Sequence, residues 1–341
     1  MERVTRADVA REAGLAPSTV SLILNGRGRQ VKISEATIAR VERIARELNY
    51  IPNAAARSLR SGNSHLIALL MAELPDDPFV PVVHTVLTTA MIEIQRRGYL
   101  LVPLFQSSDD PSDAEVIRSV MGDTQLAGVI RETTSDERFS STLLWNMGIP
   151  VVGMSMIEAD DSADGAALVR IDESAGVAAI IRRTDLPSGE AAHAVFIAGP
   201  NTNHSRQNPV LARFGDRARM ISLPDWDEAT AYQAAFTLLS QDPRLELVCV
   251  ADDSQAPGVI AAARDLDIPV PERLSVLGFG NQEPRSGERL GLTTVEWPLR
   301  EMTRLAVQEV IAAIESPSPG AVGRVRTLPT SPVWRTSVRA C

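Results

Sequence analysis

The sequence has 341 residues, of which 44% are hydrophobic and 23% charged, a composition typical of a globular protein with more than one domain. Its two cysteines are too few for a disulfide framework or a four-cysteine zinc site. It also lacks an apolar run long enough to cross a membrane and the hydrophobic stretch of a secretion signal. These features argue against a secreted or membrane protein and favour a cytoplasmic one.

The net charge of −9 is unevenly distributed, since residues 1–62 carry +5 and the remaining residues carry −14. A basic end on an acidic body is typical of a protein that meets a polyanion at one end. An excess of this size also arises by chance, so the charge alone does not decide the matter.

Three short helices are expected in the first fifty residues. The first follows Thr5, a good N-terminal cap, and ends at Gly14. Pro17 suits the first position of the second helix, which stops near Asn25. Two short helices joined by about three residues that include a glycine form the helix-turn-helix pattern. A third helix opens at Ser34 and has an apolar stripe with helical spacing.

A shorter helical segment, residues 54–60, follows Asn53. About seven residues are too few for a helix that is stable on its own. We expect this segment to order against DNA or a second copy of itself, and a plain interdomain linker is the alternative interpretation.

Several motifs occur in a fixed order across residues 3–62. They are VAREAG (9–14), STVS (18–21), LNG (24–26), LNYIPN (48–53) and ARSL (56–59). Together they resemble the DNA-binding head of the lac repressor/galactose repressor family. The resemblance implies a helix-turn-helix head (1–52), a hinge helix with its linker (53–63), and a homodimer that reads a near-palindromic double-stranded operator.

The resemblance also implies which side chains meet DNA. Pro17, Ser18 and Leu22 stand where the family often has longer polar side chains. Ser18 and Thr19 would be the main polar readers of bases. Leucine forms no hydrogen bond to a base but can contact a thymine methyl group. Leu59 would enter the minor groove as an apolar wedge that bends the duplex. Phosphate contacts are expected from Thr5, Ser21, Asn25 and Tyr50, and hinge contacts from Asn53, Ala56 and Arg57.

Arg29 lies in an unusually long basic loop, residues 26–32. The loop either adds phosphate contacts or is simply solvated, and both interpretations stay open.

After residue 62, short apolar runs alternate with helical stretches. This alternation predicts two α/β lobes with parallel doubly wound sheets. The expected strands are residues 66–71, 99–105, 127–130, 150–154, 168–171, 194–198, 246–250 and 274–279. The expected helices are residues 82–97, 173–183, 228–240, 255–266 and 299–315.

The body resembles the periplasmic-binding-protein-like effector domain of the same family more loosely. The similar pieces include LAGVI (126–130), DSQAPG (253–258) and SVLGF (275–279). The resemblance implies an effector-binding and dimerisation domain (64–341), with most of the dimer surface on lobe one and the ligand between the lobes. Lobe one would cover about 64–158 and 293–322, and lobe two 159–292 and 323–341.

Ligands of open α/β sheets bind beyond the carboxyl ends of the strands. This rule selects eight candidate effector-binding residues: Phe79, Arg131, Met156, Asp172, Arg206, Trp226, Asp253 and Asn281. Aromatic faces combined with carboxylates suit a sugar or a related metabolite. The alternatives are core aromatics for Phe79 and Trp226, a helix cap for Asp253 and a solvated helix residue for Arg206.

Two positions depart from the family pattern. Gly280 stands where an aspartate usually binds the ligand, and Pro209 stands where an arginine is common. The function that the resemblance implies is a transcriptional repressor controlled by a small-molecule effector. Because of these two departures, the alternative is a regulator of the same DNA-binding type whose cleft has lost or changed its ligand, and which answers to a protein partner or to none. Neither a catalytic motif nor a cofactor or metal motif stands out, so an enzyme is not expected.

Overall fold

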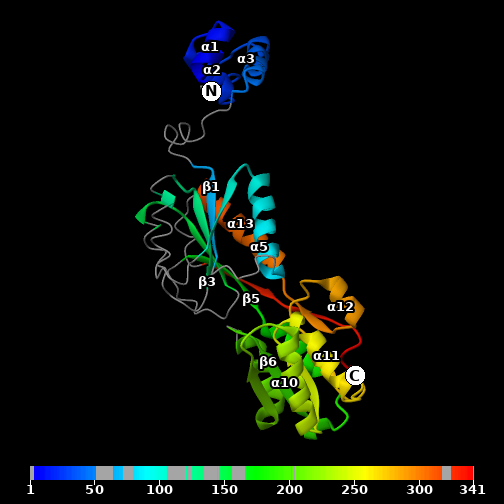
Figure 1. Ribbon diagram of the computed structural model, residues 1–341. Helices are drawn as coiled ribbons and strands as arrows, with labels where there is room; N and C mark the ends of the chain where they lie inside the picture. Colours follow the sequence, from blue (N-terminus) through cyan, green and yellow to red (C-terminus); the bar gives the residue numbers. More distant parts are fainter. Residues whose placement is uncertain are drawn as a thin grey trace. The chain divides into compact units, whose positions relative to one another are not determined.

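The computed structural model describes residues 4–50, 64–71, 80–105, 120–121, 124–133, 144, 146–155, 166–200, 202, 204–316 and 324–340. The chain divides into two compact units, the head (Met1–Ser64) and the body (His65–Cys341), shown in Figure 1. Six of the expected site residues lie outside the described residues: Asn53, Ala56, Arg57, Leu59, Phe79 and Met156.

The head consists of three helices packed around one small core. Thr5 and Asp8 form a complete capping box at the start of the first helix, and Gly14 ends that helix with a left-handed φ of 63°. Ser34 caps the third helix through the N–H of Thr37. The helices are α1 (Arg6–Ala13), α2 (Pro17–Leu24) and α3 (Glu35–Glu47), and their fully buried core residues are Val9, Val20 and Val41.

The first part of the body is a six-stranded parallel sheet in the order β11-β5-β4-β3-β1-β2. Its interior strands β1 and β4 are mostly apolar and buried, as expected for a sheet covered on both faces. The helices α5 (Pro81–Arg96) and α13 (Leu299–Glu315) pack against each other beside it (Figure 1). The strands are β1 (Leu66–Met71), β2 (Leu100–Phe105), β3 (Gly128–Thr133), β4 (Val151–Ser155), β5 (Ala167–Asp172) and β11 (Val325–Pro329).

The second part of the body is a four-stranded parallel sheet in the order β7-β6-β8-β9. Leu247, Val248 and Val276 are completely buried between this sheet and its helices. The strands are β6 (His193–Ala198), β7 (Ala218–Ser222), β8 (Leu245–Val250) and β9 (Ser275–Leu277). The helices are α8 (Ser174–Arg183), α9 (Asn208–Phe214), α10 (Glu228–Gln241), α11 (Ala256–Asp265) and α12 (Pro284–Leu290).

A small antiparallel pair, β10 (Thr294–Glu296) with β12 (Ser331–Val333), lies where the chain crosses between the two sheets. The expected lobe boundaries fall after residues 158, 292 and 322, and the first and third of these differ from the structure. The observed first sheet instead includes β5 and β11, because β5 pairs with both β4 and β11. The chain therefore crosses later than the sequence indicated.

The fold class predicted from the sequence, a helical head followed by a two-lobed α/β body with parallel sheets, is confirmed. The elements that the sequence did not predict are β7, β10, β11, β12, α9 and α12. All are short, and β7 and β11 are only partly buried, so they lack the continuous apolar run that marks the other strands.

Candidate functional site

The first turn of α2 is open to solvent. Pro17 and Ser18 are exposed, and Thr19 and Leu22 are partly buried. Ala16, at the capping position, supplies no side-chain acceptor for the free N–H groups of this turn. The start of α2 therefore presents a hydroxyl group and unsatisfied backbone donors, both of which suit a polyanion.

A hydrogen-bond chain joins α1 to the end of α2. Arg6 Nη1 donates to Ser21 Oγ over 2.6 Å, and Asn25 Nδ2 donates to the same oxygen over 3.3 Å. The hydroxyl group of Ser21 can itself donate to a further acceptor such as a phosphate oxygen. Arg6 was not predicted as a site residue, although an arginine at the start of the first helix could have been considered.

Two other residues that were expected to contact DNA already bind side chains within the head. Thr5 Oγ1 donates to Asp8 Oδ2 over 2.6 Å, and this bond holds the pKa of Asp8 below its ordinary value. Arg29 Nε and Nη2 bind the two carboxylate oxygens of Glu35 over 2.7 and 3.1 Å, which lowers the pKa of Glu35. Both pairs are exposed, so an incoming phosphate can compete for them. Tyr50 is half-buried against the head core.

In the body, Arg206 forms a buried ion pair. Its Nε and Nη2 donate to Glu173 over 2.9 and 3.0 Å, and its Nη1 donates to the carbonyl oxygen of Ala251 over 2.8 Å. The guanidinium carbon lies 4.1 Å from the ring centre of Phe279 and 4.6 Å from that of Trp297. Arg206 is 7% exposed and Glu173 is 1% exposed, so a solvated helix position is wrong for Arg206.

The carboxylate of Asp253 forms hydrogen bonds within the protein. Its Oδ1 accepts from Thr294 Oγ1 over 2.6 Å, and its Oδ2 accepts from the N–H of Asn281 over 2.8 Å. Burial raises its pKa to about 6. The expected helix-capping role belongs to its neighbour Asp252, whose Oδ1 accepts from the N–H of Ser254 over 2.9 Å.

Asp252 also faces the position where the family pattern has an aspartate. A methyl group placed on Gly280 would lie 3.7 Å from Asp252 Oδ2. Asn281, next to this glycine, accepts a hydrogen bond from Arg335 Nη2 over 3.0 Å and donates to Glu296. A carboxylate is thus present beside Gly280, although it comes from the segment after β8 rather than from the segment after β9.

The remaining described candidates lie at the end of β5 (Asp172), on β3 (Arg131) and in the loop before α10 (Trp226). Asp172 Oδ1 accepts from the N–H groups of Ser174 and Ala175 at the start of α8. Trp226 is 36% exposed, so it is not a core aromatic. Arg131 is buried on β3, in register with Leu70 of β1.

The structure therefore brings Arg206, Asp253 and Asn281 together, with three residues that the sequence did not select: Glu173, Asp252 and Trp297. The indole Nε1 of Trp297 is buried and has no hydrogen-bond partner among the described residues. Trp297 directly follows β10, so the rule of strand ends could have selected it had that three-residue strand been predicted.

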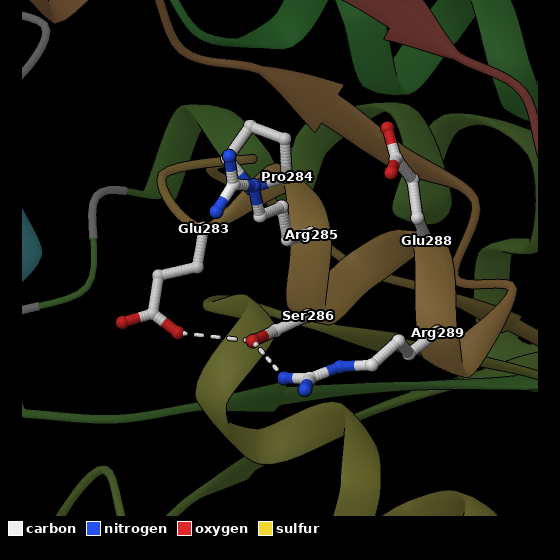
Figure 2. Close-up of a pocket in the computed structure, with 6 residues that line it drawn as sticks. All are labelled: Glu283, Pro284, Arg285, Ser286, Glu288 and Arg289. Atoms are coloured by element: carbon white, nitrogen blue, oxygen red, sulfur yellow. Dashed lines mark hydrogen bonds between the residues drawn. The ribbon is translucent and has the colours of Figure 1, made fainter.

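A separate hollow lies along α12 (Figure 2). Its volume is about 900 Å³, and its lining residues are Glu283, Pro284, Arg285, Ser286, Glu288 and Arg289. Ser286 Oγ donates to Glu283 over 3.3 Å and accepts from Arg289 over 3.1 Å, so these side chains partner one another. None of the residues selected above lines this hollow.

Across the described ranges, no cluster of three or more histidine, cysteine, aspartate or glutamate side chains could hold a metal ion. Within the same part of the chain, no helix is both long and apolar enough to cross a membrane.

Comparison with known proteins matches both parts of the chain. Residues 5–53 match the family described as bacterial regulatory proteins, lacI family, and residues 191–338 match the periplasmic binding protein-like domain. The ribose operon repressor of Escherichia coli (strain K12) is 27% identical over 336 residues, covering 92% of this chain and 94% of that protein. A sucrose operon repressor of Klebsiella pneumoniae is 34% identical over 129 residues, covering 38% of this chain and 37% of that protein.

Solved structures share the fold over most or nearly all of the chain. The lac repressor bound to ONPG has a TM-score of 0.77 at 19% identity and covers 99% of this chain and 100% of that one. A LacI family regulator from Enterococcus faecalis V583 with bound ribose has a TM-score of 0.61 at 14% identity, covering 80% of this chain and 99% of that one.

Proposed function

Because the chain belongs to the lacI family of bacterial regulatory proteins and is a DNA-binding repressor of that type, we propose that it acts as a homodimer on a near-palindromic operator under the control of a small-molecule effector. The members of this family are transcriptional regulators rather than enzymes. The observation that carries the proposal is the exposed, uncapped first turn of α2 in a head that matches the family model.

The head would read DNA with α2. Ser18 and Thr19 would donate to base edges in the major groove, while Pro17 and Leu22 would make apolar contacts. Phosphates would be bound by the Arg6–Ser21–Asn25 chain, with Thr5, Arg29 and Tyr50 in support. The hinge residues Asn53, Ala56, Arg57 and Leu59 would contact the central minor groove.

The dimer surface would lie on the first lobe. The edge strand β2 leaves Leu100 55% exposed, and the neighbouring helix α5 leaves Met91 42% and Ile92 45% exposed. Exposed apolar side chains that gather on one surface often mark a protein interface. An uncovered edge strand is also a site where a second chain can pack.

The effector would bind between the lobes, at the carboxyl ends of β6, β8 and β9. Asp252 and Trp297 would contact the effector together with the residues expected from the sequence. Asp253 would hold the backbone of the site in place through its hydrogen bonds to Asn281 and Thr294. Two relatives are named as ribose and sucrose operon repressors, which supports a sugar or a related metabolite as the effector. Ligand binding would change lobe closure and the spacing of the two hinges, coupling the two sites.

A second candidate is a regulator whose cleft no longer takes a sugar and which answers to a protein partner or to none. Two observations favour it: Gly280 has no acceptor side chain, and every nitrogen of Arg206 already donates to the protein. A ligand-controlled repressor changes its operator affinity when the effector is added, whereas the second candidate does not.

The experiment that tests the proposal is selection of genomic DNA fragments by the purified full-length protein near physiological salt, followed by sequencing. Enrichment of a near-palindrome is the expected result, and the genes beside the enriched sites name the pathway from which effectors are then tried. Recovery of fragments in proportion to bulk DNA would contradict site-specific repression, because non-specific binding comes almost entirely from phosphate contacts.

A further inference from the structure

This inference deepens the effector part of the proposed function and rests on it. Arginine recognises phosphate and carboxylate groups through its planar fork of N–H donors. In this protein Glu173 occupies the Nε and Nη2 side of the Arg206 fork, and the Ala251 carbonyl oxygen binds Nη1. The aromatic rings of Phe279 and Trp297 lie against the guanidinium as well. Arg206 is therefore neutralised and enclosed, and is not presented to a ligand.

The other charged groups near Arg206 are mostly acidic. Asp252 follows Ala251 directly and faces Gly280, and Asp172 precedes Glu173. Glu296 lies beside Asn281 and is countered there by Arg335, which bonds the same asparagine. Carboxylates accept hydrogen bonds from hydroxyl or amine groups and repel anions.

From this arrangement we infer that the effector site excludes anionic ligands, and that Glu173 is the specificity-determining residue that does so. The effector would present hydroxyl or amine donors to Asp252 rather than a phosphate or carboxylate to Arg206. The unpartnered Nε1 of Trp297 offers a donor for a neutral oxygen of the same class of ligand.

The test compares the full-length wild type with Glu173→Gln, which keeps the size of the side chain but removes the charge that neutralises Arg206. Asp185→Asn is the matched control, because it releases Arg339 from an ion pair of 2.6 Å elsewhere in the body. The probes are inorganic phosphate and D-ribose 5-phosphate, with D-ribose as the neutral analogue and sodium chloride at equal ionic strength. Binding is measured by equilibrium dialysis and by the shift in Tm.

In the wild type, we expect neither anion to raise Tm beyond the sodium chloride control. Glu173→Gln should bind both anions at least about tenfold more tightly than the wild type, because it leaves the positive charge of the Arg206 guanidinium uncompensated. Asp185→Asn should behave as the wild type does. Saturable binding of either anion to the wild type, or no gain in Glu173→Gln, would overturn the inference.

Circular dichroism shows first whether Glu173→Gln folds, since removing one partner of a buried ion pair is destabilising. If the variant does not fold, the wild type alone provides the test. A saturable rise in its Tm with D-ribose 5-phosphate overturns the inference, and the absence of such a rise supports the inference. The proposed function is judged separately, by whether a neutral ligand changes operator affinity. If Glu173→Gln gains affinity for phosphate but no neutral ligand changes operator affinity, the inference about Glu173 holds and the proposed sugar effector is refuted.

Discussion

Trp226 lies directly against Gly199 at the end of β6. A methyl group on Gly199 would come within 2.5 Å of the indole carbons of Trp226. The glycine is therefore what allows the ring to occupy this place, and Gly199→Ala should displace the ring.

Displacing this ring should remove the effector response without touching the head. In both Gly199→Ala and Trp226→Ala we expect basal operator affinity to stay within about twofold of wild type, while the effector response falls at least about tenfold. Fluorescence anisotropy of labelled operator DNA, with and without the effector, measures both quantities. Phe236→Ala is the control, because this aromatic is equally exposed at 36% on α10. A normal response in Trp226→Ala would place the pocket elsewhere.

Ser18 should contribute to base reading. Ser18→Ala removes a hydroxyl from the exposed first turn of α2, so specific affinity should fall about fivefold, the effect of one ordinary hydrogen bond. Non-specific binding should not change. Competition between operator and random DNA measures the two affinities, and Ser222→Ala, an exposed serine of the body, is the control. An equal loss on both DNAs would mean that Ser18 contacts phosphate instead.

Leu59 should act as a wedge. Leu59→Ala is expected to weaken operator binding by at least about tenfold and non-specific binding much less, since only the operator complex gains from a bent duplex. DNA bending is measured by energy transfer between the ends of the operator. Unchanged bending in Leu59→Ala, or equal losses on both DNAs, would refute the wedge.

Leu100 should lie within the dimer surface. Leu100→Glu places a charge on the exposed edge strand, so the dimer dissociation constant should rise at least about tenfold. Sedimentation velocity across a concentration series gives that constant. Leu211→Glu, on an exposed apolar residue of α9, should leave it unchanged. If Leu211→Glu raises the dimer dissociation constant and Leu100→Glu does not, the dimer interface lies on the second lobe instead.

Asp253 should make stability depend on pH. Burial raises its pKa in the folded state from 3.8 to about 6, so between these values the folded protein binds more protons than the unfolded chain. The advantage of the wild type over Asp253→Asn in free energy of unfolding should therefore shrink as the pH rises from 3.8 to about 6, and stay level above that. Denaturant titrations across this range measure it. An advantage that grows with pH would show a lowered pKa.

The parts of the protein with strong local patterns were predictable. The helix cap at Thr5, the left-handed Gly14 and Pro17 at the start of α2 are signals carried by a few neighbouring residues, and the structure reproduces them. The long apolar strands of the body follow from composition in the same way.

The contacts of the site depend on residues far apart in the chain. Arg206 was selected, but its partner Glu173 lies 33 positions away, and no local pattern links the two. Asp252 and Asp253 are neighbours in the sequence, and only Asp253 was predicted to contact the effector. In the structure Asp253 bonds Thr294, and it is Asp252 that faces Gly280. Which of two neighbours faces a site is set by backbone geometry, which composition and spacing do not contain.

Whether two heads of a dimer read two half-sites is measured by the affinity of the full-length protein for altered operators. The enriched near-palindrome is compared with a single half-site and with a version in which about five base pairs, half a helical turn, separate the halves further. We expect the intact palindrome to bind at least about a hundredfold more tightly than either. Equal affinity for the half-site and the palindrome would mean that a single head binds DNA on its own and would refute the dimeric mode of binding.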